Sequence, residues 1–226
     1  MKLAPLVLAT LTSVSLSLLP SFASAHKAGD FILRAGAATV DPSEDSGSVF
    51  VGGSDTGMEV GADSNTQLGL TFTYMLADHW GIGLLAATPF EHTLSLKKSV
   101  LGLGDGTLAD MKHLPPTVTL QYYFNKPASA FQPYVGAGIN YTTFFDEEFS
   151  STRKNQGFSS LDLDDSWGWA AEVGVDYQIN DKWVVNGTLW YLDIDTTAEF
   201  RFGGSKSKVD VDIDPWVYML GVGYKF

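Results

Sequence analysis

Few side chains in this sequence have the types and spacing that catalysis or metal binding requires. The chain has no cysteine, which excludes thiol catalysis, disulfides and cysteine-ligated zinc. Aspartate occupies every second position of the segment 210–214, as in a calcium loop, but Pro215 stands where that loop needs glycine. Whether a divalent cation binds among these aspartates is left open. The glycines of segment 102–106 lack a following helix, and we interpret them as a loop.

His79, His92 and His113 have neither the helical nor the tight spacing of metal ligands. His92 and His113 could form a hydrolase-type site only if the elements that carry them meet. The charge balance limits the partners further. With 14 Lys and Arg against 26 Asp and Glu, the formal net charge is −12, which argues against nucleic acid because phosphate binding needs clustered basic residues.

The N-terminus has the pattern of an export signal. Lys2 is followed by apolar or small residues over 3–19, and the segment 23–25 reads A-x-A, a cleavage signature. A membrane anchor is the alternative, but Pro5 and several Ser and Thr residues interrupt the apolar run. We therefore expect a signal peptide at 1–25 and a mature chain at 26–226. An exported chain without cysteine fits a bacterial envelope compartment.

The elements of the mature chain show the period of two that is typical of strands. Although 45% of the residues are hydrophobic, no later stretch has the roughly 18 continuous apolar residues of a membrane helix. Apolar residues instead alternate with small or polar ones in eight segments: 31–37, 68–76, 80–86, 118–124, 131–145, 167–179, 183–191 and 216–226.

The apolar faces of these segments are free of charge over a length that suits a tilted membrane strand, about 9–11 residues. Their opposite faces carry Gln121, Asn140 and Asn186, so a soluble sandwich with an apolar core is disfavoured. Long polar links at 42–65, 93–114 and 147–163 alternate with short turns at 77–79, 126–130 and 180–181. This pattern predicts an all-β fold, an eight-stranded antiparallel transmembrane β-barrel with both termini periplasmic.

Several segments also resemble a known family. They read HKAGDFILRAGAATVDP at 26–42, NTQLGLTFTYM at 65–75, LLAATPFEH at 84–92, HLPPT at 113–117, PYVGAGINYTTFFD at 133–146, LWYLDIDTTA at 189–198 and DPWVYMLGVGYKF at 214–226. These resemble the OmpW family of small outer-membrane proteins, most closely its pseudomonad members. The loops at 43–64 and 93–112 carry little of the resemblance, which leaves any ligand preference set there open.

The resemblance implies a barrel of the outer membrane with a largely hydrophobic interior channel. It also implies passive uptake of small hydrophobic compounds, which leave through the barrel wall into the membrane. No enzymatic activity and no cofactor are implied.

Three prolines bear on such a lateral exit. Pro89 lies in the outer half of the third predicted strand, and Pro115 and Pro116 open the fourth. Because proline has no N–H to donate, we expect the seam between these strands to be poorly paired near its extracellular end. The three residues are candidates for a lateral gate. The alternative is that they only end strands at loops; the resemblance at HLPPT and ATPF favours the gate.

The outer parts of two strands reverse the apolar phase. From Trp216 to Phe226 the even-numbered positions are apolar. Before that segment the apolar residues Val209 and Ile213 occupy odd-numbered positions, with aspartates between them. Leu192 and Ile194 are likewise out of phase with the apolar positions before them. Either bulges shift the register, or the barrel rises above the membrane with an apolar interior and an acidic exterior. Both hypotheses stay open here.

An eight-stranded barrel is just wide enough for side chains to fill it, which excludes a wide aqueous pore. The inward positions predicted to line the channel are Met75, Leu85, Tyr123, Tyr134, Trp190, Val217 and Met219. Four inward charges should form a buried ion-pair cluster, either for stability or as a plug, because a lone buried charge is costly: Arg34, Glu172, Asp176 and Lys225.

The leading hypothesis is an outer-membrane channel for small hydrophobic molecules with lateral exit between the third and fourth strands. A structural or receptor-type barrel without transport is the alternative, as is passage of small polar solutes along the inward Gln, Asn and Thr. An outer-membrane enzyme is the third hypothesis, and we expect no enzymatic activity. The expected partners are membrane lipid and hydrophobic solutes, without nucleic acid, metal or cofactor, and the expected state is a monomer. The solute itself is not determined by the sequence.

Overall fold

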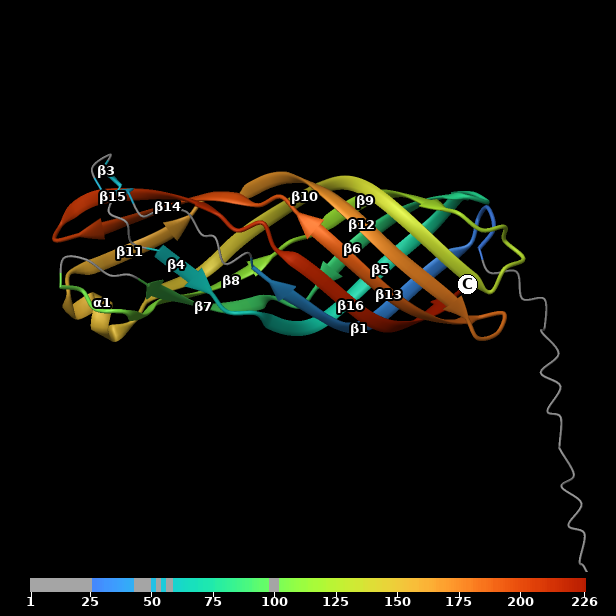
Figure 1. Cartoon of the computed structure of the whole chain (residues 1–226), viewed down its shortest axis with the longest axis horizontal. Helices are drawn as coiled ribbons and strands as arrows, with labels where there is room; N and C mark the ends of the chain where they lie inside the picture. The colour runs from blue at the N-terminus through green and yellow to red at the C-terminus, as the bar shows by residue number, and fades with distance from the viewer. Residues whose placement is uncertain (1–25, 43–49, 52–53, 56–58, 98–101) are drawn as a thin grey trace, which may run out of the picture.

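The alternating segments pair into a closed antiparallel barrel (Figure 1). The computed structural model describes residues 26–42, 50–51, 54–55, 59–97 and 102–226, so the predicted signal peptide at 1–25 lies outside the described residues. The barrel strands are β1 (Phe31–Asp41), β5 (Asn65–Ala77), β6 (Trp80–Ala87), β9 (Thr117–Tyr123), β10 (Phe131–Phe149), β12 (Ser166–Gln178), β13 (Trp183–Leu192) and β16 (Trp216–Lys225). Within the described ranges, no helix is long and apolar enough to span a membrane.

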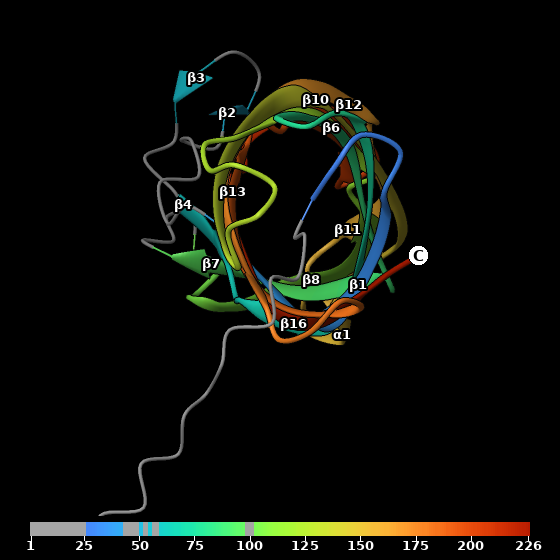
Figure 2. The ribbon, with the colours of Figure 1, turned by 90° about the vertical axis from the view of Figure 1, so that its right-hand side faces the viewer.

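Each barrel strand pairs with its neighbours in sequence, and β1 closes the ring against β16 with Ala37 opposite Leu220. Figure 2 looks along the barrel and shows this ring. Short turns join β5 to β6 and β12 to β13 at the end where the C-terminus lies. The predicted eight-stranded barrel is confirmed.

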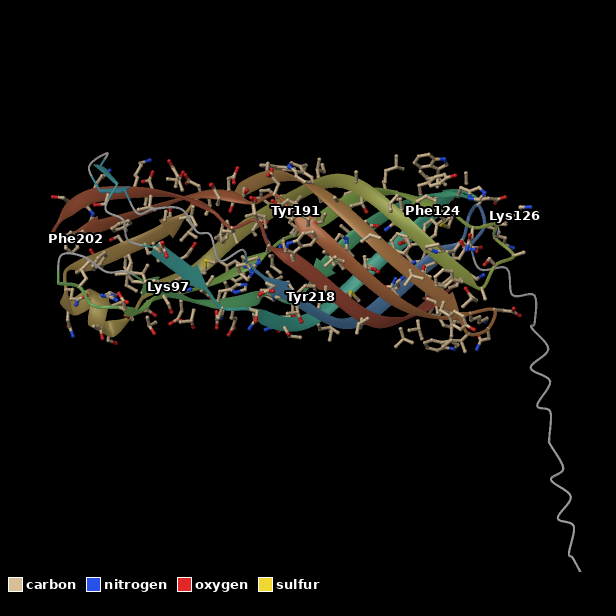
Figure 3. All side chains as sticks on the ribbon, viewed as in Figure 1. Lys97, Phe124, Lys126, Tyr191, Phe202 and Tyr218 are labelled. Atoms are coloured by element: carbon tan, nitrogen blue, oxygen red, sulfur yellow. The ribbon has the colours of Figure 1, made fainter. Side chains whose placement is uncertain are left out.

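An apolar belt covers the outside of the barrel. Large hydrophobic side chains stand exposed on every one of the barrel strands, among them Leu68, Ile82 and Leu220. Figure 3 shows Phe124 and Lys126 near the end with the short turns, Lys97 and Phe202 at the opposite end, and Tyr191 and Tyr218 between. Bilayer hydrocarbon is the environment that makes such a belt favourable.

Beyond the belt the barrel continues as two sheets. Strands β4 (Glu59–Ala62), β7 (Phe90–Lys97) and β8 (Gly106–Leu114) extend the barrel sheet beside the outer half of β10, and β11 (Phe158–Leu163), β14 (Asp195–Phe202) and β15 (Ser205–Asp212) form the second sheet. The remaining elements are the short pair β2 (Phe50–Val51) and β3 (Ser54–Asp55), and the helix α1 (Ser151–Asn155).

The prediction of long polar links at 93–114 and 147–163 was therefore wrong in part, since β7, β8 and β11 occupy much of them. The reason is physical. Above the bilayer the outward side chains face water and are polar, so these strands lack the outward apolar signal of the membrane part.

The strand register also separates the two hypotheses about the apolar phase. Val209 and Ile213 are buried, and so are Val217 and Met219 beyond the break between β15 and β16. Odd-numbered residues thus point inward on both sides of the break, and Asp210 and Asp212 between them are exposed. The register does not slip. The apolar face moves from the outside to the inside, which confirms the apolar interior with an acidic exterior.

Close strand approach makes one glycine a sensitive position. A Cβ added to Gly138 in β10 would lie 1.8 Å from the backbone oxygen of Val118 in β9. We expect Gly138→Ala to reduce the folded fraction strongly after refolding in detergent, measured as the gel band that changes mobility on heating. The matched control is Gly187→Ala, whose Cβ would meet only the movable Leu220 side chain at 3.3 Å. Equal refolding yields would contradict this account.

Candidate functional site

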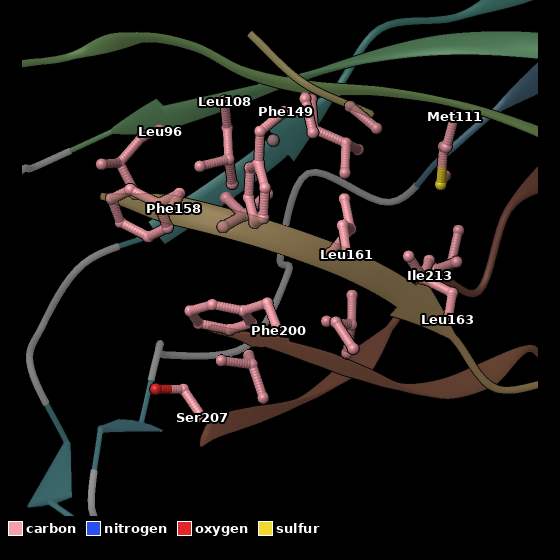
Figure 4. Close-up of a pocket in the computed structure, with 18 of the residues that line it drawn as sticks. Leu96, Leu108, Met111, Phe149, Phe158, Leu161, Leu163, Phe200, Ser207 and Ile213 are labelled. Carbon is pink, nitrogen blue, oxygen red and sulfur yellow. The ribbon is translucent and has the colours of Figure 1, made fainter. Parts of the chain in front are cut away.

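The extracellular half of the molecule encloses an apolar cavity of about 120 Å³ between its two sheets. This is similar to the roughly 150 Å³ that holds a benzene molecule in a dry protein cavity. Figure 4 shows the labelled lining residues, which are apolar except for Ser207: Leu96, Leu108, Met111, Phe149, Phe158, Leu161, Leu163, Phe200 and Ile213. The cavity can therefore hold a small apolar molecule without leaving polar groups of the cavity wall unpaired.

Inward alternation on several strands builds this cavity. Phe149 ends β10, Phe158 opens β11, and Phe200 lies on β14, yet their rings lie 5.3 to 5.9 Å apart. Aromatic rings at such separations attract each other beyond the burial of their area. These contacts join the two sheets around the cavity.

A buried arginine holds part of the cavity wall. Arg153 of α1 is 1% exposed and donates hydrogen bonds to the carbonyl oxygens of Leu103 (2.7 Å) and Gly104 (2.8 Å). Leu103 lines the cavity. The segment 102–106 is the predicted loop, and its three glycines have positive φ. The sequence carries no local signal for Arg153, because its acceptors are backbone atoms about 50 residues away.

An apolar layer lies between the cavity and the lower barrel. It includes Leu85, Trp190, Val217 and Met219, packed with residues such as Phe144. Met75, Tyr123 and Tyr134 form a second cluster. All seven residues predicted to line a channel are buried and inward, but none borders the cavity. Their role in lining a transport path stays a prediction.

The lower barrel is filled by a polar network around one ion pair. Arg34 Nε donates to Asp176 Oδ1 at 2.9 Å, a second guanidinium nitrogen binds the other carboxylate oxygen, and both side chains are 1% exposed. Arg34 also donates to Thr73 Oγ1 at 2.8 Å, and Asn186 and His26 each contact the Asp176 carboxylate at 2.8 Å. The network crosses the interior from β1 to β12.

The other two predicted members of the charge cluster lie elsewhere. Glu172 accepts hydrogen bonds from Gln121 and Trp190, each at 2.6 Å, and is linked to Arg34 only through neutral side chains. Lys225 pairs with Asp30 at 3.6 Å. Sequence reasoning missed His26 and Asp30 because they precede the first strand and belong to no periodic pattern.

The three prolines lie at an interruption of the barrel ladder. Pairing of β6 with β9 ends at Leu85 opposite Thr117, and pairing of β7 with β8 resumes at Phe90 opposite His113. Pro89, Pro115 and Pro116 occupy the gap. On the other side, the Pro116 oxygen accepts from Tyr141 N at 3.0 Å, so the seam with β10 stays joined.

None of the three prolines borders the cavity. Pro42, which follows β1, does border it, together with residues of β4 and β15, which belong to different sheets. The gate role of Pro89, Pro115 and Pro116 therefore stays a prediction. Among the described residues, no three His, Asp or Glu side chains converge as metal ligands would.

Comparison with known proteins agrees with this architecture. The OmpW family model matches residues 27–226. The chain belongs to the OmpW family. Outer membrane protein W of Vibrio cholerae is 52% identical over 213 residues, covering 94% of each chain. As a member of this family, the protein is an outer-membrane β-barrel.

The crystal structure of OprG from Pseudomonas aeruginosa superposes with a TM-score of 0.84 at 56% identity, covering 90% of this chain and 98% of OprG. A more distant relative is a Pseudomonas aeruginosa protein named as the dibenzothiophene metabolism operon protein PahQ. It is 28% identical over 166 residues, 73% of this chain and 74% of its own length.

The buried ion pair should have a large cost when broken on one side only. Arg34→Met leaves the Asp176 carboxylate buried without its partner, and we expect a loss of about 3–5 kcal/mol in the free energy of unfolding in urea. The double variant Arg34→Met/Asp176→Leu should lose less, because no charge remains buried. Lys112→Met, which breaks exposed pairs with Glu91 and Asp146, is the control and should cost far less, because water screens charges at the surface. Additive losses in the double variant would argue against this coupling.

Proposed function

We propose that the protein is a passive channel through which small hydrophobic molecules enter the outer membrane. The apolar cavity, placed outside the membrane belt and above the polar network, carries this proposal. A hydrophobic molecule in this cavity is held above the membrane by a surface that needs no hydrogen bonds from it. We propose membrane lipid and small hydrophobic solutes as its partners.

The filled lower barrel argues for a sideways exit. Passage straight down would disrupt the hydrogen bonds of Arg34, Asp176 and Glu172, which would leave buried charges unpaired. We propose the interruption between the β6–β9 and β7–β8 ladders as the way to the lipid. The name of the relative PahQ points in the same direction, since dibenzothiophene is an apolar aromatic compound.

We propose that the chain acts as a monomer without catalytic activity. Its eight barrel strands all find their partners within one chain, so the membrane part has no unpaired edge to join. His92 and His113 do come together, with ring centroids 5.0 Å apart. The rings stack on each other, and His92 Nε2 and His113 Nδ1 have no hydrogen-bond partner, whereas a hydrolase would aim one of them at a nucleophile.

Filling the cavity should slow uptake. We expect intact cells that display the protein to take up N-phenyl-1-naphthylamine, a dye that fluoresces on reaching phospholipid, faster than cells without it. Ala109→Phe places a ring in the cavity and should reduce the rate toward the protein-free level. The control is Ala171→Phe on the outward face of β12, at equal surface expression. A rate equal with and without the protein would favour the structural or receptor-type barrel.

Restoring a backbone donor at the interrupted seam should also slow uptake. Pro115→Ala adds an N–H on the side of the strand that faces the interruption, because the neighbouring Pro116 faces β10, where its oxygen accepts from Tyr141 N. One hydrogen bond is worth about 0.5–1.5 kcal/mol, so the open fraction should fall roughly two- to tenfold. Dye uptake measures this effect. Pro133→Ala, in β10 at the far end of the barrel, is the control. Equal uptake by Pro115→Ala and the parent chain would contradict exit through this seam.

A further inference from the structure

Two histidines lie between the apolar cavity and the proline interruption. His92 is an inward residue of β7 and His113 an inward residue of β8, and they are 2% and 3% exposed. One inward position farther out on each strand, Leu94 and Met111 line the cavity. The next inward position on the other side of each histidine falls at the interrupted seam, at Phe90 and at Pro115. The histidine pair is thus the first polar feature below the cavity on this wall.

The hydrogen bonds of the two rings leave nitrogens without partners. His92 Nδ1 lies 2.5 Å from the backbone oxygen of Asp63 and must donate its proton there, because a carbonyl oxygen only accepts. His92 Nε2 then carries a lone pair, and it is buried with no hydrogen-bond partner. His113 Nδ1 is buried without a partner as well. Buried polar atoms in folded proteins nearly always have a hydrogen-bond partner. Two such nitrogens without a partner, on two stacked rings, therefore point to a site for a polar group of a ligand.

The surroundings keep both rings neutral at ordinary pH. Burial lowers the pKa of His92, and burial together with His92 lowers the pKa of His113 to about 3. The Asp63 carboxylate lies 3.9 Å from His92 Nδ1 and is largely exposed. The pair therefore offers the lone pair of His92 Nε2 and one neutral imidazole nitrogen of His113.

The ring geometry argues against a metal ion as the ligand. The two ring planes are only 12° from parallel, with centroids 5.0 Å apart. The lone pair of an imidazole nitrogen lies in the ring plane, so two nearly parallel rings cannot both aim at one ion at the roughly 2.0–2.1 Å that a zinc–nitrogen bond needs. Hydrogen bonds are longer and tolerate bent angles, so a polar group between the rings is compatible with this geometry. A carboxylate is disfavoured too, because it only accepts hydrogen bonds and His92 Nε2 offers a lone pair and no proton.

We propose that His92 and His113 bind the hydroxyl group of an apolar alcohol whose hydrocarbon part occupies the cavity. A hydroxyl donates to the His92 lone pair and retains lone pairs, so it can also accept from His113 if that nitrogen is protonated. A pure hydrocarbon leaves both nitrogens unpaired. This inference rests on the proposed function, because it names the class of molecule that the same path favours.

Nitrogen NMR on the full barrel in phosphatidylcholine vesicles tests the proposal. The protein carries ¹⁵N-histidine, and 1-octanol or n-octane is added at equal mole fraction. We expect the His92 Nε2 resonance, assigned by its loss in His92→Phe, to move with 1-octanol and to stay unchanged with n-octane. His79→Phe, at a turn on the periplasmic side, is the matched control and should keep the shift. Equal responses to the two compounds, or none to 1-octanol, would overturn the proposal.

Competition against dye uptake gives a second readout in intact cells. We expect 1-octanol to slow the protein-dependent uptake more than n-octane does. His113→Phe, which leaves the His92 bond to Asp63 intact, should weaken this competition about three- to tenfold, as expected for one lost hydrogen bond. Undiminished 1-octanol competition in His113→Phe would count against the histidine site while leaving the channel in place. Dye uptake that does not depend on the protein would instead refute the channel, and the nitrogen resonances would still report alcohol binding.

Discussion

The pairing of backbone hydrogen bonds inside the bilayer is the constraint on which the rest of this structure depends. Hydrocarbon offers no partner for an unpaired N–H or C=O, so the sheet must close, here by pairing β1 with β16. Closure with eight strands fixes a narrow interior that side chains fill. The ion pair of Arg34 and Asp176 and its hydrogen-bonded neighbours occupy that interior. The lower barrel is therefore filled by hydrogen-bonded side chains.

The constraint weakens at the membrane surface, and the architecture changes there. Within the described residues, every barrel strand except β10 is interrupted near this level or ends there, at positions such as Pro89, Pro115 and the break between β15 and β16. Water can satisfy backbone groups above it, so the ring opens into two separate sheets. The apolar side chains turn inward while the register is kept, as Val209 to Val217 show. The same alternation thus builds a lipid-facing belt below and an apolar cavity above.

Much of the fold could be predicted because its signal is local. An alternation with a period of two over about ten residues can be recognised from neighbouring residues alone, and so can the short turns between strands. The extracellular strands β7, β8 and β11 were interpreted as polar links because their apolar residues face inward and no lipid face marks them. The charge cluster was predicted from parity alone, which placed Arg34 and Asp176 inside correctly but could not assign partners. Lys225 pairs with Asp30, and Glu172 is bound by Gln121 and Trp190.

The sequence by itself determined the strand number, the sides of each strand, the inward parity of the charged and aromatic residues, and the location of the prolines. Only the tertiary structure decided which inward side chains meet, because barrel register brings together residues more than 100 positions apart, as it does for Arg34 and Asp176. It also decided that the outer strands enclose a cavity and that His92 and His113 stack beneath it. The alternation along a strand determines which side of the sheet a residue faces, whereas barrel closure and the stagger of the strands determine which residues it contacts.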